Sequence, residues 1–150
     1  MADFNYQIRE LEASDFEKGF VDCLQELTVV GEISNEQFIS RFNKRKSMGI
    51  ITAVAVEDNT GKILGTGSLF YEPKFIRSCS FKGFIEDICV AKYAQRRGVG
   101  KKIVEYLRER ALSDGCYKVI LTCSEQNQNF YEKIGFQKIE VAMAVYESKD

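Results

Sequence analysis

Two neighbouring stretches of the chain carry the residue types most suited to chemistry. Glu86 and Asp87 are adjacent carboxylates inside an apolar run, and residues 95–101 read Gln-Arg-Arg-Gly-Val-Gly-Lys. Glycines let the backbone approach an anion closely, and free N–H groups at a helix start point toward it. With basic side chains beside them, residues 95–101 are typical of a diphosphate-binding loop. A solvated basic loop at a helix start is the open alternative, because short glycine motifs often match by chance.

The chain contains no histidine in its 150 residues, which restricts the chemistry. Ser-His-Asp and Cys-His nucleophile systems, histidine-ligated zinc and histidine general bases are all excluded. Acid–base steps must therefore use carboxylates, tyrosine, lysine or cysteine.

Charge and cysteine usage indicate the kind of partner. The 21 basic and 22 acidic residues leave a net charge of −1, which argues against nucleic acid or an anionic membrane as the main partner. The five cysteines form no Cys-x-x-Cys pair, as is usual for reduced thiols. The start has no signal-peptide pattern, and no apolar run approaches the roughly 18 residues of a membrane span. We expect a soluble cytoplasmic protein with a small-molecule partner and no metal.

Two capping-box patterns indicate where the first helices begin. Ser14 with Glu17, and Ser34 with Gln37, place a hydroxyl three residues before a side chain that can reach back to the backbone. Apolar residues at helical spacing follow each pair. The patterns predict two amphipathic helices that end near the glycines at positions 31 and 49.

The remaining elements alternate between strands and helices within one expected domain, residues 1–150. Strand patterns cover residues 4–9, 51–56, 63–71, 84–90, 117–123 and 136–146. Helix patterns cover residues 99–111 and 126–134. Antiparallel neighbours in the first half and helical crossovers in the second predict an α/β fold, with three α-β-α layers and a central mixed, mostly antiparallel sheet.

The order of these motifs resembles the GNAT superfamily of N-acetyltransferases. Gln-x-x-Gly-x-Gly after a strand is similar to the acetyl-CoA loop of that superfamily, and Asn127-x-x-Phe130-Tyr131 is similar to its later motif. Three further motifs resemble, more narrowly, the branch that acetylates glucosamine 6-phosphate: Ile-Glu-Asp at 85–87, Gly-Cys-Tyr-Lys at 115–118 and Phe-Tyr-Glu-Lys at 130–133. The resemblance runs from about Tyr6 to Met143 and implies a GNAT fold.

The resemblance also implies roles for individual residues. Glu86 and Asp87 orient and deprotonate the acceptor amine, a backbone N–H near Ile88 binds the oxyanion, and the Tyr131 hydroxyl meets the sulfur. The positions implied to bind acetyl-CoA are Ile88, Cys89, Val90, Arg96, Arg97, Gly98, Val99, Gly100, Lys101, Asn127 and Tyr131.

Several of these roles have alternatives. If the strand alternates regularly, Glu86 shares the apolar face of Ile88 and Val90, which disfavours its ionised form and suits a base. The acidic pair is otherwise a hydrogen-bonded pair at a strand edge, and Tyr131 a core aromatic. Cys89 and Cys123 are candidates for an acetyl-thioester intermediate, but without a histidine to activate a thiol, direct attack in a ternary complex is simpler.

The acceptor implied by the resemblance is glucosamine 6-phosphate, on the way to UDP-N-acetylglucosamine. The implied substrate positions are Thr28, Lys74, Arg77, Glu86, Asp87, Tyr117 and Lys118. Two residues depart from the family: Thr122 stands where Asp is common, and Tyr146 where an Arg near the C-terminus often helps to hold phosphate. The resemblance further implies a homodimer that exchanges C-terminal strands, in keeping with an apolar run at residues 141–145.

Two other functions remain open. A different small amine or a protein amine is one, although Lys74 and Arg77 would repel a cationic polyamine. A non-catalytic acetyl-CoA-binding module is the other, and the presence of Glu86, Asp87 and Tyr131 counts against it.

Overall fold

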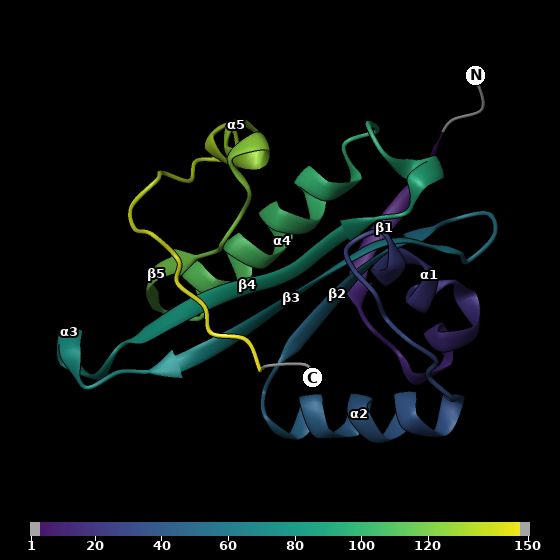
Figure 1. The fold of residues 1–150 in the computed structure, drawn as a ribbon, viewed down its shortest axis with the longest axis horizontal. Coiled ribbons are helices and arrows are strands. Elements are labelled where there is room, and N and C mark those ends of the chain that lie inside the picture. Colours follow the sequence, from purple (N-terminus) through teal and green to yellow (C-terminus); the bar gives the residue numbers. More distant parts are fainter. Residues whose placement is uncertain (1–3, 148–150) are drawn as a thin grey trace.

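Five strands form one mixed sheet between two layers of helices in the computed structural model, which describes residues 4–147 (Figure 1). The sheet order β1-β2-β3-β4-β5 follows the chain. The strands are β1 Tyr6–Glu10, β2 Ile51–Glu57, β3 Ile63–Pro73, β4 Phe81–Val90 and β5 Cys116–Ile120. All neighbours are antiparallel except β4 and β5, which are parallel. The predicted three-layer α/β fold with a mostly antiparallel sheet is confirmed.

Helices cover both faces of the sheet. They are η1 Ala13–Lys18, α1 Phe20–Gln25, α2 Asn35–Ser47, α3 Ile76–Cys79, η2 Lys92–Ala94, α4 Val99–Ser113, η3 Glu125–Asn127 and α5 Gln128–Glu132. The buried side of α4 packs on one face, and α1 and α2 cover the other (Figure 1). Strand β2 therefore buries residues of both orientations, at positions 53–56. Among the described residues, no helix combines the length and apolar character that crossing a membrane requires.

The two capping-box predictions had different outcomes. Ser34 and Gln37 form the predicted box at the start of α2. The box at Ser14 is wrong, because the cap lies two residues earlier and joins Glu12 to Asp15. Buried Asp15 accepts two hydrogen bonds from Arg9, at 2.8 and 2.9 Å, and one from the Glu12 N–H. This tertiary contact with β1 fixes the start of η1.

The predicted first helix is also interrupted. Gly19 lies in the left-handed region, with φ of 90°, and separates η1 from α1. A left-handed residue breaks the helical hydrogen-bond series, and glycine adopts it without steric cost. Several other predicted boundaries differ by a few residues: β4 begins at Phe81 rather than 84, β5 ends at Ile120 rather than 123, and the helix over 126–134 divides into η3 and α5.

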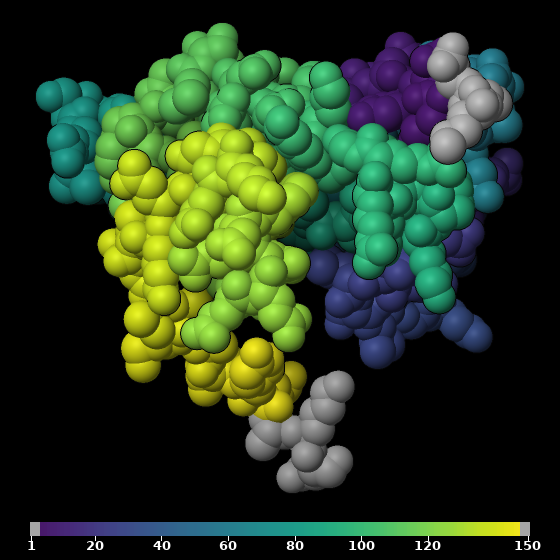
Figure 2. Space-filling model, turned by 90° about the horizontal axis from the view of Figure 1, so that it is seen from above, coloured from purple at the N-terminus to yellow at the C-terminus, as the bar shows by residue number. Residues whose placement is uncertain are grey.

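The predicted strand over residues 136–146 is wrong for the described chain. This segment is irregular and follows the surface, and it is coloured yellow in Figure 2. Its alternate apolar side chains Val141, Met143 and Val145 are 86, 94 and 96% exposed. Strand propensity alone does not produce a strand, because the segment needs a sheet edge to pair with and a surface to cover.

Candidate active site

A β-bulge in β4 places the acidic pair. Thr66 pairs with Cys89 and Ser68 with Glu86, so Gly67 alone faces both Asp87 and Ile88. Asp87 takes a left-handed φ of 54°, which is uncommon for a residue with a side chain. An extra residue in one strand bends it and changes which way the following side chains point.

The bulge overturns the predicted placement of Glu86. Glu86 is the cross-strand partner of Ser68, whose hydroxyl is held by Arg45 of α2, so Glu86 lies on the α2 face. Ile88 lies on the α4 face, because a Cβ on Gly67 would meet its Cδ1 at 2.3 Å beside side chains of α4. Regular alternation would have put both on one face, and the extra residue at the bulge separates them.

Both carboxylates of the pair reach the surface. Glu86 and Asp87 are exposed, yet partial burial and the neighbouring charge of Asp87 raise the pKa of Glu86 above its usual value. The upward direction of this pKa shift agrees with the sequence prediction. Its causes are burial on the α2 side of the sheet and the charge of the adjacent Asp87 carboxylate. A carboxylate with a raised pKa is a better proton acceptor than an ordinary one.

Next to the acidic pair, β4 has an unpaired edge. Its parallel pairing with β5 covers only Phe81 to Phe84, and β5 ends at Ile120. Within the described chain, Ile88, Cys89 and Val90 therefore have no strand partner on the β5 side. This edge can hydrogen-bond an extended ligand in the way that another strand would.

The glycine loop forms the start of α4, at the end of this edge. Arg96 and Gly98 have left-handed φ values of 62° and 79°, and Gly98 is the residue before the first turn of the helix. Space around Gly98 is open, since no atom lies within 4 Å of a Cβ built there. The first N–H groups of the 15-residue helix α4, at Val99, Gly100 and Lys101, thus face an accessible site with positive potential.

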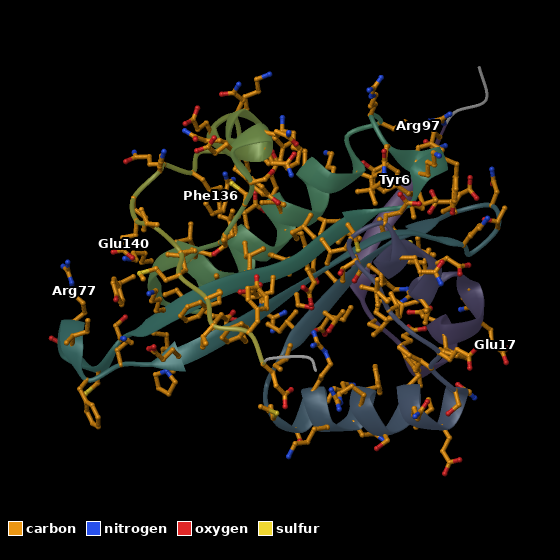
Figure 3. The ribbon with its side chains drawn as sticks, viewed as in Figure 1. Tyr6, Glu17, Arg77, Arg97, Phe136 and Glu140 are labelled. Atoms are coloured by element: carbon orange, nitrogen blue, oxygen red, sulfur yellow. The ribbon has the colours of Figure 1, made fainter. Side chains whose placement is uncertain are left out.

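The basic side chains of the loop are placed differently from one another. The Arg97 guanidinium lies 4.5 Å from the centroid of the Phe4 ring, near the start of β1 (Figure 3). Lys101 pairs with Glu105 at 3.8 Å. Arg96 is exposed.

Helix α5 lies beside the start of α4. A Cβ on Gly100 would lie 3.5 Å from the Phe130 ring and 3.4 Å from Val90, so Gly100 allows α5 and β4 to approach. Tyr131 packs against Phe130 and Phe136, and burial and the nearby Cys123 raise its pKa, which keeps its hydroxyl protonated. Asn127 is exposed at the end of η3.

The loop between β3 and β4 carries the predicted acceptor cations. Lys74 is bound by both carboxylate oxygens of Glu72, at 2.7 and 3.2 Å. Arg77 lies 5.5 Å from the centre of the Tyr117 ring and has a left-handed φ of 56°, as do the two residues after it. The structure therefore brings Lys74, Arg77 and Tyr117 together, and Lys118 follows on β5.

Other predicted positions lie elsewhere. Thr28 is exposed in the loop after α1, which lines a shallow depression over residues 25–31. Helices α1 and α3 are at opposite ends of the long axis (Figure 1), and Figure 3 labels Arg77 at one of these ends and Glu17 at the other. A recess lies between the yellow-green C-terminal part and the teal and blue parts (Figure 2). One chain therefore does not bring Thr28 and the Lys74 loop to a common point.

Comparison with known proteins identifies the family of this arrangement. The family model described as "Acetyltransferase (GNAT) family" matches residues 5–136. The chain belongs to the GNAT family of acetyltransferases. It is 43% identical over 143 residues to glucosamine 6-phosphate N-acetyltransferase of Arabidopsis thaliana, covering 94% of this chain and 96% of the relative. It is also 43% identical over 148 residues to glucosamine 6-phosphate N-acetyltransferase 1 of Dictyostelium discoideum, covering 97 and 94%.

Solved structures agree with this assignment. The crystal structure of the Arabidopsis thaliana glucosamine-6-phosphate N-acetyltransferase is 42% identical, with a TM-score of 0.93 over 96% of this chain and 99% of that one. An acetyltransferase of Trypanosoma brucei is 36% identical, with a TM-score of 0.90 over 95 and 100%. The GNAT fold inferred from the sequence motifs is confirmed.

Two cysteines of this GNAT chain are poorly suited to act as nucleophiles. Burial raises the pKa of Cys89 to about 12 and that of Cys23 to about 11. Both thiols lie in the core between the sheet and α1. Since the thiolate is the nucleophilic form, the buried Cys89 thiol is a poor acetyl carrier, whereas Cys123, the other candidate, is exposed.

Sequence reasoning missed three residues that shape the GNAT site. Gly67 makes room for Ile88 at the bulge, and Ser68 and Arg45 lie on the α2 side of Glu86. The glycine left a signal, because an isolated glycine inside a strand pattern indicates a bulge or a close approach. Arg45 left none, since a basic residue in the last turn of a helix is ordinary.

Proposed function

We propose that the chain transfers the acetyl group of acetyl-CoA to the 2-amino group of glucosamine 6-phosphate, which gives N-acetylglucosamine 6-phosphate and CoA. The observation that carries the proposal is the similarity of nearly the whole chain, at 43% identity, to two relatives with that name. The acidic bulge beside an unpaired strand edge and an anion-binding helix start supports the same chemistry.

We propose that acetyl-CoA lies along the open edge of β4. The pantetheine arm pairs with Ile88 to Val90, and the pyrophosphate is held by the N–H groups and basic side chains of residues 96–101, with Asn127 nearby. The acyl group then lies beside Glu86 and Asp87, because the edge and the bulge are continuous.

The transfer itself uses four protein groups. The neutral amine attacks the thioester carbon, and Glu86 accepts the proton that the nitrogen loses as the C–N bond forms. The N–H of Ile88 stabilises the negative charge on the carbonyl oxygen. When the C–S bond breaks, the sulfur keeps the electron pair and accepts a hydrogen bond from the Tyr131 hydroxyl. Asp87 accepts a hydrogen bond from the neutral amine and orients it for attack.

The acceptor phosphate is assigned to the loop between β3 and β4 and the adjoining strand β5. Positive charge is supplied by Lys74, Arg77 and Lys118. The ring of Tyr117 contacts the Arg77 guanidinium and orients it. In the free protein, Lys74 is neutralised by Glu72, so the phosphate shares the ammonium with that carboxylate.

A second copy of the chain completes the acceptor site in our proposal. The separation of Thr28 from the Lys74 loop supports this, as do the exposed apolar side chains Phe75, Val141 and Val145. These three side chains are 96, 86 and 96% exposed, and apolar side chains this exposed are candidates for burial in an assembly. Light scattering should give twice 17.1 kDa, and full activity at the monomer mass would exclude the dimer.

A thiol-release assay tests the substrate. Glucosamine 6-phosphate, glucosamine, spermidine and a lysine peptide are compared at equal concentration with acetyl-CoA. We expect the highest kcat/KM for glucosamine 6-phosphate. Our proposal assigns the reaction to the cytoplasm and to UDP-N-acetylglucosamine synthesis. A preference for glucosamine or spermidine would make the chain an acetyltransferase for another amine. Acetyl-CoA binding with no turnover of any amine would make it a binding module.

A further inference from the structure

Arg45 connects helix α2 to the sheet directly beside the acidic pair. Its side chain is half-buried, and one terminal nitrogen, Nη2, donates to the hydroxyls of Thr52 at 3.1 Å and Ser68 at 2.6 Å. Thr52 and Ser68 are cross-strand partners, and Ser68 is in turn the partner of Glu86. The guanidinium thus lies over a row of residues that crosses β2 and β3 and ends at Glu86 on β4.

Within the part of the chain that the structure describes, the charge of Arg45 has no contact partner of opposite sign. No carboxylate among residues 4–147 forms an ion pair with it. Burial lowers the pKa of Arg45, the charge of Asp87 raises it, and Arg41 on the same helix lowers it. Glu10 of β1 and Lys46 of α2 line a surface depression with Arg45. Of the carboxylates around it, Asp87 is the one that stabilises the buried cation.

We propose that Arg45 is a positioning residue that keeps the acidic pair ionised and fixes the strand row from which Glu86 extends. The inference rests on the proposed function of Glu86 and Asp87. Two adjacent carboxylates oppose each other's ionisation, and a fixed cation nearby offsets that repulsion. Because the guanidinium is hydrogen-bonded to two strands, its distance from the bulge is set by the fold rather than by a free side chain.

The inference predicts a change in the pH dependence of the reaction. Without the cation beside its cross-strand partner Ser68, Glu86 holds its proton more tightly, so the acid limb of kcat/KM moves to higher pH. We expect R45Q to move it upward by about 0.5–1 pH unit, as for a charge several ångströms away in a partly solvated site. R45K keeps the charge and should leave the limb near its wild-type position. The KM for acetyl-CoA should be unchanged in both variants.

The matched control is K44Q, which removes the same charge from an exposed position on the same helix. It should leave the acid limb in place. An equal shift in K44Q and R45Q would make the effect one of net charge, and a folded R45Q with the wild-type limb would overturn the proposal. A shift in R45K equal to that in R45Q would also overturn it, because the cation is then irrelevant.

A carboxyl titration by NMR, without substrates, separates this inference from the proposed function. In the wild type, the Arg45 side-chain nitrogen resonances should move with the same apparent pKa as the Glu86 carboxyl. This readout needs neither turnover nor a stable R45Q protein. If the wild type fails to acetylate glucosamine 6-phosphate but the resonances move together, the proposed function fails and the coupling stands. If the Arg45 resonances do not follow the Glu86 carboxyl, the coupling fails whatever the substrate.

Discussion

The proposed site has a cofactor half and an acceptor half, which differ in the kind of protein group that contacts the ligand. The cofactor half is largely backbone, namely the open edge of β4 and the start of α4, and a buried helix face holds both in place. The acceptor half is largely long side chains on exposed segments, with Lys74 and Arg77 on one loop and Thr28 on another. Backbone groups fixed by the fold lose little conformational freedom on binding, whereas long side chains must be ordered by the ligand. Substitutions should therefore affect the two halves separately.

The largest effect should come from a charge placed in the backbone half. G98D puts a carboxylate at an open position where pyrophosphate is expected, so acetyl-CoA affinity should fall by roughly 100-fold or more. Asp tolerates a left-handed φ and suits the position before a helix, so the protein should stay folded. Calorimetry measures the affinity, and circular dichroism checks the fold. G98N is the uncharged control and should lose much less; unchanged affinity in folded G98D would remove the anion-binding role of this loop.

The side-chain half should respond selectively to loss of its cations. K74A/R77A should raise the KM for glucosamine 6-phosphate roughly 100-fold, because charge-assisted hydrogen bonds to a phosphate dianion are lost. The KM for acetyl-CoA should change less than about twofold. Steady-state kinetics with each substrate varied in turn makes the comparison.

The control for this pair is K44A/K92A, which removes two exposed charges far from the loop. It should leave both KM values near wild type. Wild-type KM values for K74A/R77A would show that the phosphate binds elsewhere. The acceptor half as defined here would then be wrong.

Tyr131 lies on α5 and contacts Phe130, whose ring is beside Gly100 at the start of α4. Loss of the Tyr131 hydroxyl should affect the rate rather than binding. Y131F keeps the ring contacts with Phe130 and Phe136 but removes the hydroxyl. We expect kcat to fall about tenfold with little change in either KM, as for loss of one hydrogen bond to a leaving group. Y106F, another half-buried tyrosine of the core, should retain wild-type kcat. An unaffected kcat in Y131F would reassign Tyr131 to core packing.

Substitution of Asp15, which is buried in η1, should have the smallest effect on activity and a large effect on stability. D15N removes the charge and one of the two oxygens that accept from Arg9, and it should lower the free energy of unfolding by about 2–4 kcal/mol. Arg9, Glu12 and Lys18 hold the pKa of Asp15 below its usual value, although its burial opposes them. The ionised carboxylate therefore stabilises the fold above about pH 4, and this contribution disappears as the pH falls through the lowered pKa.

Urea unfolding at pH 7 and at pH 3 measures this contribution. The difference between wild type and D15N should shrink at the lower pH, while the KM for acetyl-CoA stays constant at pH 7. A constant difference at both pH values would show that the Asp15 charge is not the stabilising feature.

Sequence reasoning recovered what depends on local pattern. The Ser34 cap, the β2–β3 hairpin, the buried face of α4 and the glycine loop before it are where periodicity and spacing predict them. Each is encoded by neighbours a few residues apart, so the sequence contains the necessary information.

What sequence reasoning missed depends on contacts between distant segments. The ion pair of Arg9 with Asp15 places the first cap at Glu12 rather than Ser14, and the bulge opposite Gly67 moves Glu86 to the other face. The segment 136–146 has a strand pattern but pairs with no strand within the described chain. In each case a tertiary partner decides between two locally acceptable conformations.

The short parallel contact between β4 and β5 also bears on the order of folding. Strands β2 to β4 are joined by short connections, but β5 must return through the whole of α4 to form its few pairs with β4. Closing this crossover carries an entropic cost before any contact rewards it, so β5 and α5 should join after the β2–β4 meander. The part of the proposed acetyl-CoA site that lies beside β5 and α5 is then completed only after the β2–β4 meander has formed. Acetyl-CoA, by binding the finished state alone, would slow unfolding of this late unit and leave the early meander unaffected.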